Sequence, residues 1–297
     1  MGTKIMITFF TVPKPFKGDI AIIQENAIKS WLRLHSKCEV ILYGDEEGVK
    51  EICEKYSLSH VPSIEKNEYG TPTLKFIFNN VQKISKNKIL CYVNSDIILF
   101  SDVITTIKRI PFQKFLLVGQ RRDADISNII NYEDLAWESE LRDYIMENQK
   151  PFHGGIDYFI FPKHTFSEIP PFAVGRAGWD NWMIYNSRKL NIPTIDATQS
   201  IMAVHQNHSY SHVPNRTGIN YYGPESDNNV ILSGGRRIYL WDLDDVNWTV
   251  TPSYLIHKNI TLRECFRFLI LKSPRFFHPL FEAGFWIQHI IRYKKIG

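Results

Sequence analysis

Three small polar residues, Asn94-Ser95-Asp96, interrupt an otherwise apolar run between Ile89 and Phe100. The five residues before them show no alternation of polar and apolar side chains, which is typical of a buried strand covered on both faces. Ligands of open α/β sheets bind beyond the carboxyl ends of such strands. A carboxylate at that edge, beside two short side chains, suits a divalent cation that holds a diphosphate. A polar turn between two core strands is the alternative interpretation.

A second group of polar residues accompanies a pair of glycines. Gly154 and Gly155 precede the strand-like run 156–161, which carries Asp157. A glycine pair beside a strand often lets the backbone approach a ligand closely, and as often marks only a turn. Asp157 is accordingly a candidate for contact with a ligand, or else a surface residue of an edge strand.

A carboxylate between two indoles forms the third group, in Trp179-Asp180-Asn181-Trp182. A partly desolvated carboxylate beside surfaces on which sugar rings stack is a candidate general base. The alternatives are that Asp180 caps the helix expected over 181–190 and that both tryptophans belong to the core.

Histidines form the fourth group. His205 and His208 follow the strand-like run 201–204, with His212 further on. Imidazole is a common ligand of divalent metals, although a histidine in an apolar context also occurs as a hydrogen-bonded core residue.

Hydrophobic periodicity predicts the elements that must position these groups. Strands and helices alternate along the first half, which predicts an α/β fold with a mostly parallel, Rossmann-like sheet flanked by helices on both faces. Thr71-Pro72 is expected to begin the helix that ends at Ile84. The region 220–237 is expected to be a loop and a candidate lid. We expect strands over 4–11, 40–43, 89–93, 115–119, 156–161 and 201–204, and helices over 20–34, 49–56, 71–84, 101–109, 131–147 and 181–190.

Composition restricts the class of protein. The 297 residues are 44% hydrophobic and 22% charged, which suits a globular protein of one large domain or two and excludes disordered and fibrous classes. The four cysteines show no CxxC spacing, which favours a reducing compartment. The apolar run 5–10 is too short for a signal peptide, and no apolar span reaches transmembrane length. These features predict a cytoplasmic protein.

The basic charge is concentrated in the C-terminal segment. The whole chain carries +4, whereas residues 258–297 hold eight Lys or Arg against two Glu, or +6, which leaves −2 for 1–257. This distribution argues against a catalytic domain built for nucleic acid. The aromatic segment 262–297 is interrupted by Pro274 and Pro279, so we expect two short helices. They either lie on an anionic membrane surface, as a peripheral anchor, or pack on the protein.

Over about residues 4–212, the order of these pieces resembles that of GT-A-type nucleotide-diphospho-sugar glycosyltransferases. The resemblance rests on an N-terminal α/β half, an Asp-x-Asp-like motif at 94–96, a glycine-led strand at 154–157, Asp180 at a later helix, and His205. The sequence departs from the pattern at Asn94, an amide where the family has its first carboxylate. The resemblance implies a catalytic domain over 1–257, which divides into a nucleotide-binding half (1–119) and a donor-sugar and acceptor half (120–257). A helical segment over 258–297 would follow this domain.

The resemblance also implies roles for single residues. Asp96 and His205 would hold Mn²⁺ or Mg²⁺, Asp180 would be the catalytic base, and Trp179 and Trp182 would contact the acceptor. The residues implied to bind the nucleotide and donor sugar are Thr11, Pro13, Asp45, Asn94, Ser95, Asp96, Gly155, Asp157 and His208.

The expected function is transfer of a sugar from a nucleotide diphosphate, expected to be UDP, to a saccharide or lipid-linked saccharide. A single base on the acceptor side favours inversion of configuration, although a retaining enzyme of this fold could also carry an acid there. A sugar-1-phosphate nucleotidyltransferase is one alternative, but 11–18 lacks the glycine- and arginine-rich phosphate loop of that class. A non-catalytic carbohydrate-binding protein is the other, because Asn94 weakens the metal site.

Overall fold

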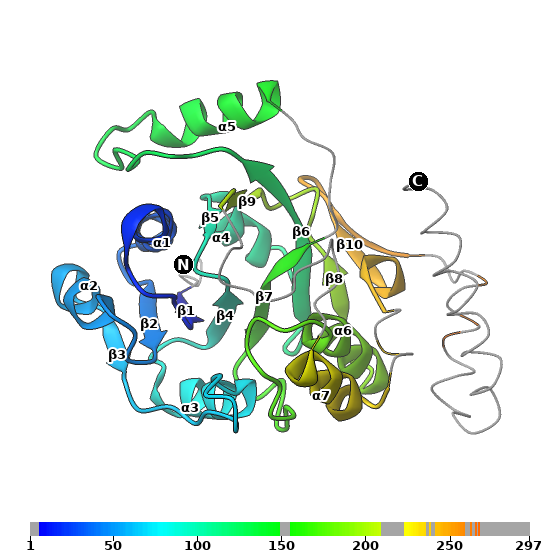
Figure 1. The fold of residues 1–297 in the computed structure, drawn as a ribbon. Helices are drawn as coiled ribbons and strands as arrows, with labels where there is room; N and C mark the ends of the chain where they lie inside the picture. Colours follow the sequence, from blue (N-terminus) through cyan, green and yellow to red (C-terminus); the bar gives the residue numbers. More distant parts are fainter. Residues whose placement is uncertain are drawn as a thin grey trace, which may run out of the picture.

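A central sheet organises the part of the chain that the computed structural model describes, which comprises residues 6–148, 155–208, 223–235, 238, 241–258, 262, 265 and 267. Eleven strands of these residues join in it, in the order β11-β10-β8-β6-β7-β4-β1-β2-β3, with β5 and β9 branching from β6 (Figure 1).

The first half forms the parallel side of this sheet. Strands β3, β2, β1 and β4 are parallel neighbours, so their carboxyl ends share one edge. The chain moves from β1 outward to β2 and β3 and then returns to β4 on the other side of β1, and ligands of open α/β sheets bind at such a reversal of strand order. The bounds are β1 Ile7–Thr11, α1 Gly18–Arg33, β2 Glu39–Tyr43, α2 Val49–Tyr56, β3 Ser59–Val61, α3 Leu74–Ile84 and β4 Ile89–Val93.

The second half inserts an antiparallel strand. β7 pairs antiparallel with both β4 and β6, so its start lies at the edge where those two strands end. Beyond that edge, β6 continues and pairs with β9, which also pairs with β5. The bounds are β5 Ile97–Leu99, α4 Asp102–Ile107, β6 Leu116–Ala124, α5 Trp137–Glu147, β7 Ile156–Pro162, α6 Trp179–Lys189, β8 Thr194–Asp196, β9 Ala203–Gln206, α7 Pro224–Ser233, β10 Trp248–Val250 and β11 Leu255–His257.

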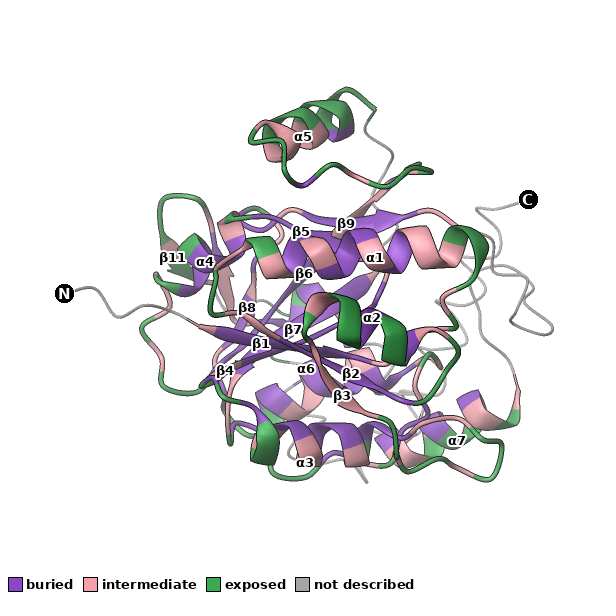
Figure 2. Ribbon diagram, turned by 90° about the vertical axis from the view of Figure 1, so that its left-hand side faces the viewer, coloured by how far each residue is buried: buried purple, intermediate pink, exposed green. Residues whose placement is uncertain are grey.

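Both faces of the sheet are buried because its strands are apolar on both sides. In β4, Cys91 and Val93 face a cluster with α1, α2 and α4, while Leu90 and Tyr92 face a cluster with α3 and α6. Figure 2 shows α1 and α2 on one side of the sheet and α3 on the other, with α5 standing further out. This arrangement confirms the predicted α/β class with helices on both faces.

Three expectations about elements need correction. The helix α3 begins at Leu74 after an N-cap at Thr73, so Thr71-Pro72 lies before the helix, where Pro72 bridges to Lys66. The region expected to be a loop over 220–237 contains α7, with Pro224 at its first position, although residues 220–222, 236 and 237 lie outside the described part. The strand β3 was not predicted, because its three residues are too few for a periodic signal.

The aromatic segment 262–297, expected to lie on a membrane surface or to pack on the protein, lies almost wholly outside the described residues. Its buried described residue, Arg267, pairs through Nε with Asp245 Oδ1 at 3.1 Å and lies over the ring of Trp241. At this position the segment packs on residues 241–245 of the preceding part of the chain. No helix in the described ranges is both long and apolar enough to cross a membrane.

Gly119 in β6 provides a test of the packing at the sheet edge. A Cβ there would lie 2.1 Å from Tyr158 Oη and 3.0 Å from the Thr198 backbone nitrogen. We expect Gly119→Ala to lower the free energy of unfolding by about 1–3 kcal/mol, as overpacking does, in urea denaturation.

The hydroxyl of Tyr158 is buried and has no hydrogen-bond partner among the described residues, so Tyr158→Phe alone should be nearly neutral. In the Gly119→Ala background the same change should restore part of the lost stability. Additive effects of the two changes would show that the clash does not exist.

Candidate functional site

One carboxylate and two imidazoles meet at the carboxyl edge of β4. Asp96 follows β4, His205 lies in β9, and the β5–β9 ladder brings them together because Ile97 is the register partner of His205. The Nε2 atoms of His208 and His205 lie 3.1 and 3.7 Å from Asp96 Oδ2. One potential ligand atom from each of the three residues lies within 4.8 Å of the others.

Asp123 in β6 fixes the orientation of His205. Its Oδ1 lies 3.0 Å from His205 Nδ1, so a neutral imidazole carries its proton on Nδ1 and turns the lone pair of Nε2 toward Asp96. A carboxylate that holds a histidine in this way is a common support of metal ligands. Arg121 Nε in turn donates to Asp123 Oδ1 at 3.0 Å.

The electrostatics of the cluster favour the forms that bind a cation. Burial opposes ionisation of Asp96, but the hydrogen bond from His208 and the nearby His205 and Lys14 hold its pKa at about 2. Burial lowers the pKa of His205 against the opposing effect of Asp96. At neutral pH, Asp96 is therefore ionised and His205 is neutral.

These donors fit a divalent metal ion. They supply one carboxylate oxygen and two imidazole nitrogens, and Asp96 Oδ1 is buried with no hydrogen-bond partner in the described part of the chain. Two nitrogen donors favour Mn²⁺ over Mg²⁺, which prefers oxygen, and the same set also suits Fe²⁺ and Zn²⁺.

A second network adjoins the cluster at the start of β7. Asn94 Nδ2 donates to Asp157 Oδ1 at 2.7 Å, and Arg121 Nη1 pairs with Asp157 Oδ2 at 2.8 Å. Asp157 is 7% exposed in a strand between β4 and β6, so the alternative of an edge-strand surface residue is wrong. In this structure the amide of Asn94 therefore donates its hydrogen bond to Asp157.

Gln24 of α1 joins the loop after β1 to the 94–96 turn. Its Oε1 accepts from the Lys14 backbone N–H at 2.7 Å and from Ser95 Oγ at 2.8 Å, and its Nε2 donates to the Lys14 carbonyl at 2.9 Å. Because these bonds fix the backbone of Lys14, its ammonium group lies within electrostatic range of Asp96. Burial lowers the pKa of Lys14, and Asp96 acts in the opposite direction.

The other predicted nucleotide and donor residues lie near the same edge with different exposure. Thr11 and Pro13 are buried at the end of β1. Asp45 lies beyond β2, and its carboxylate is 67% exposed and 3.4 Å from Lys66 Nζ. A Cβ on Gly155 would lie 3.0 Å from the Arg121 guanidinium, so the close approach expected at this glycine is made by a protein side chain. Gly154 lies outside the described residues.

Asp180 does not cap its helix. The N-cap of α6 is Gly178, with a φ of 100°, and Asp180 is the second helical residue. Burial raises the pKa of its carboxyl; nearby Asp157 raises it further, while backbone N–H groups at the helix start act in the opposite direction. Its Oδ1 is buried with no hydrogen-bond partner among the described residues. Asp180 is therefore a desolvated carboxyl close to the second network.

Trp179 and Trp182 pack in the core, which is the alternative to acceptor contact that the sequence allowed. Each is 7% exposed. The ring of Trp179 lies against Tyr92 and Phe159, and that of Trp182 against Phe172, with centroid separations of 5.1, 4.6 and 5.4 Å. Their contact with an acceptor stays a prediction.

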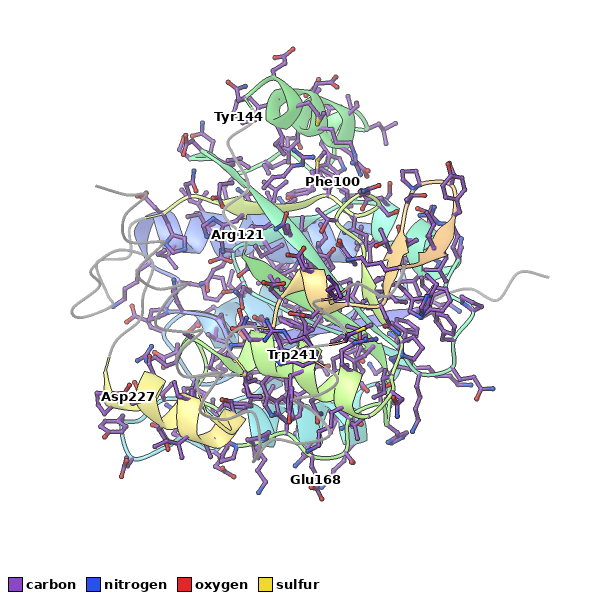
Figure 3. The ribbon with its side chains drawn as sticks, turned by 90° about the vertical axis from the view of Figure 1, so that its right-hand side faces the viewer. Phe100, Arg121, Tyr144, Glu168, Asp227 and Trp241 are labelled. Atoms are coloured by element: carbon purple, nitrogen blue, oxygen red, sulfur yellow. The ribbon has the colours of Figure 1, made fainter. Side chains whose placement is uncertain are left out.

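The sequence analysis missed Lys14, Arg121 and Asp123. Arg121 and Asp123 belong to the part of β6 beyond the predicted strand end at 119, and their alternation with Arg122 and Ala124 was the available signal. In Figure 3, Arg121 is labelled inside the outline of the molecule, whereas Tyr144 and Asp227 are labelled near the outline.

Comparisons with solved structures return several nucleotide-sugar transferases and also a 4-diphosphocytidyl-2C-methyl-D-erythritol synthase from Anaerococcus prevotii. A protein from Desulfovibrio desulfuricans described as a nucleotide-diphospho-sugar transferase is 11% identical, with 65% of this chain and 79% of that chain covered and a TM-score of 0.40. GalNAc-T7 with UDP, GalNAc and Mn²⁺ is 12% identical, with 79% and 48% covered and a TM-score of 0.49.

Glucosyl-3-phosphoglycerate synthase from Mycobacterium tuberculosis is 12% identical, with 70% and 73% covered and a TM-score of 0.39. The chain spans about half of the GalNAc-T7 chain. No protein-family model and no curated protein matches the sequence. Solved nucleotide-sugar transferases are thus among the structural matches, as the sequence resemblance predicts.

The support that Asp123 gives to His205 can be tested without any substrate. We expect Asp123→Asn to weaken Mn²⁺ binding by about 10- to 100-fold. A neutral amide accepts a weaker hydrogen bond from His205 Nδ1, so the imidazole is less well oriented and its Nε2 is a less basic metal ligand. Electron paramagnetic resonance of free Mn²⁺ measures this, with Mg²⁺ competition in parallel. The matched control is Asp143→Asn on the exposed side of α5. Equal affinities of the Asp123 variant and the wild type would rule out the supporting role.

Proposed function

We propose that this protein transfers a glycosyl group from a nucleotide diphosphate sugar, with UDP as the expected nucleotide, to a hydroxyl of a saccharide or lipid-linked saccharide. The observation that carries the proposal is the cluster of Asp96, His205 and His208 beyond the end of β4. Its position beyond the carboxyl end of β4, where the order of the parallel strands reverses, supports a nucleotide ligand. The resemblance in the order of the sequence motifs supports the same class of reaction.

The chemistry requires positive charge where the diphosphate leaves. Cleavage of the bond to the anomeric carbon passes through an oxocarbenium-like transition state, and negative charge develops on the leaving phosphate. A bound divalent metal supplies Lewis acidity at that phosphate. Lys14 provides a second positive charge, since its backbone is fixed by Gln24 and its ammonium group lies within electrostatic range of Asp96.

Asp180 is the residue that we assign as general base. Its carboxyl is desolvated, and the raised pKa brings it closer to the working pH, which makes proton transfer more effective. The buried Oδ1 has no hydrogen-bond partner among the described residues, so its lone pairs are not used within this part of the protein. A single base on the acceptor side corresponds to a one-step displacement with inversion of configuration.

Metal-dependent nucleotide binding tests the proposal at its first step. We expect isothermal titration to show UDP binding in the presence of Mn²⁺ and to lose it with EDTA. Asp96→Ala should abolish the Mn²⁺-dependent part while thermal unfolding remains cooperative, because the residue lies at the sheet edge and outside the three apolar clusters. Lys50→Ala, which removes an exposed lysine of α2 that pairs with Glu54, serves as the control. Unchanged Mn²⁺-dependent UDP affinity in Asp96→Ala would refute the assignment of the metal site.

Turnover tests the role of Asp180. With a panel of UDP-hexoses and UDP-N-acetylhexosamines, we expect Asp180→Asn to lower kcat by a factor of about 10² or more and to leave the Kd for UDP unchanged. Asp227→Asn, an exposed first-turn carboxylate of α7, is the matched control. Near wild-type turnover in Asp180→Asn would exclude it as the base.

Two further assays distinguish the proposed glycosyl transfer from the alternative functions. Formation of a UDP-sugar from UTP and a sugar 1-phosphate would identify a nucleotidyltransferase. Binding of UDP-sugars without any hydrolysis or transfer by the wild type would identify a binding protein.

A further inference from the structure

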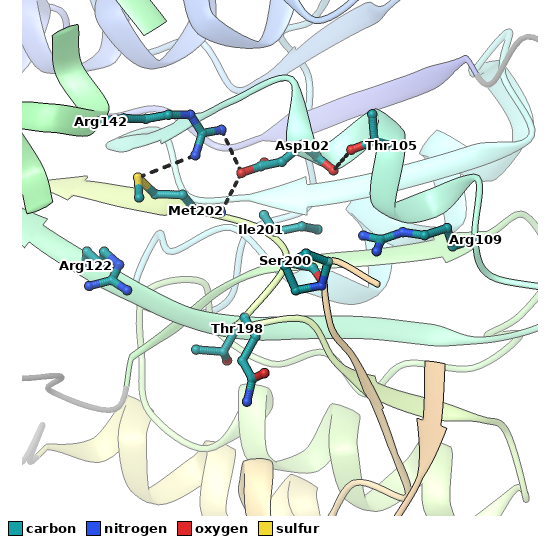
Figure 4. Close-up of a pocket in the computed structure, with 11 residues that line it drawn as sticks. Asp102, Thr105, Arg109, Arg122, Arg142, Thr198, Ser200, Ile201 and Met202 are labelled. Carbon is teal, nitrogen blue, oxygen red and sulfur yellow. Dashed lines mark hydrogen bonds and ion pairs between the residues drawn. The ribbon is translucent and has the colours of Figure 1, made fainter. Parts of the chain in front are cut away.

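We propose that a cavity on the other side of β6 from the Asp96, His205 and His208 site binds the phosphate or carboxylate group of a small organic molecule. Side chains of β6 alternate in direction. Arg121 and Asp123 contact the residues of the first site, whereas Arg122, between them, lines this cavity. The cavity measures about 540 Å³ and is shown in Figure 4.

Positive charge dominates the lining. Three guanidinium groups from three different parts of the fold face the cavity: Arg109 after α4, Arg122 in β6 and Arg142 in α5. Asp102 is the one carboxylate that lines it among the described residues. Guanidinium groups bind phosphate and carboxylate oxygens through paired, charge-assisted hydrogen bonds, so such a lining selects an oxyanion.

One arginine of the lining, Arg142, is paired with carboxylates, and another, Arg109, is not. Arg142 pairs with Asp102 at 2.7 Å and with Glu138 at 3.0 Å. Arg109 donates only to neutral groups, the Thr251 carbonyl and Thr106 Oγ1, and forms no ion pair in the described part of the chain. The charge of Arg109 is therefore not neutralised by a neighbouring carboxylate.

The remaining lining indicates that the ligand is larger than a free anion. The cavity volume lies in the range of small-molecule sites, which is well above the size of a phosphate ion. The apolar side chains of Ile201 and Met202 lie beside the hydroxyls of Thr198 and Ser200. A small organic body with hydroxyl groups and one anionic group matches this mixture.

This site is independent of the proposed glycosyl transfer. Its lining shares no residue with the metal cluster or with Asp180. Loss of UDP binding in Asp96→Ala consequently leaves anion binding intact, and failure of either proposal is distinguishable from failure of the other.

The test uses the whole protein with inorganic phosphate and citrate as probes. Both are titrated in EDTA at constant ionic strength against chloride, and the melting temperature gives the apparent Kd. We expect phosphate or citrate to raise the melting temperature above the chloride control. Arg122→Gln should weaken this binding about tenfold or more, the loss expected for a charge-assisted hydrogen bond. Arg122→Lys should retain only part of it, because lysine keeps the charge but cannot form the paired hydrogen bonds. Arg33→Gln, at an exposed arginine paired with Glu133, should retain all of it.

Hydrogen exchange of the wild type locates the bound anion without any substitution. Phosphate should slow exchange in 102–109 and 198–202 and leave 94–97 unchanged. A stronger effect of phosphate assigns a phosphate ester as the ligand, and a stronger effect of citrate assigns a carboxylate. The proposal would be overturned if neither anion raised the melting temperature above the chloride control, or if the anions raised it equally in Arg122→Gln and the wild type. Protection from exchange confined to 94–97 would also overturn it.

Discussion

The buried carboxylate of Asp157 is the constraint on which the site depends. A charge at 7% exposure is tolerated only when it is paired, and Arg121 and Asn94 provide that pairing. Arg121 then reaches Asp123, and Asp123 orients His205. Negative and positive charges therefore alternate from Asp157 through Arg121 to Asp123, and a hydrogen bond to Asp123 holds the neutral imidazole of His205 in β9.

The same carboxylate accounts for the departure from Asp-x-Asp. The position of Asn94 Nδ2, 2.7 Å from Asp157 Oδ1, would bring two carboxylates together if residue 94 were aspartate. Like charges at that distance disfavour ionisation of both groups, whereas an amide donates a hydrogen bond. Asn94 is thus matched to Asp157, and the second histidine, His208, supplies a donor to the metal cluster.

The sequence predicted what hydrophobic patterning reveals. Ile89–Val93 was identified as a central strand because both of its faces are apolar, and Asp96 and His205, both predicted as metal ligands, do meet in space. The placement of His208 beside Asp96 depends on the pairing of β5 with β9, which no local pattern indicates. Arg121 and Asp123 were missed because β6 leaves the core at its polar end and is stabilised there by pairing with β9.

The β5–β9 ladder determines when during folding the side chains of Asp96, His205 and His208 can come together. His208 and Asp96 are separated by 112 positions in the chain, so their meeting is a contact of high contact order. Closing so long a loop is slow and entropically costly before other contacts have formed. The ligands come together only when β5, β6 and β9 have paired. A partly synthesised or partly folded chain consequently cannot assemble this cluster, and a cation bound by all three side chains would act as a cross-link between distant parts of the completed sheet.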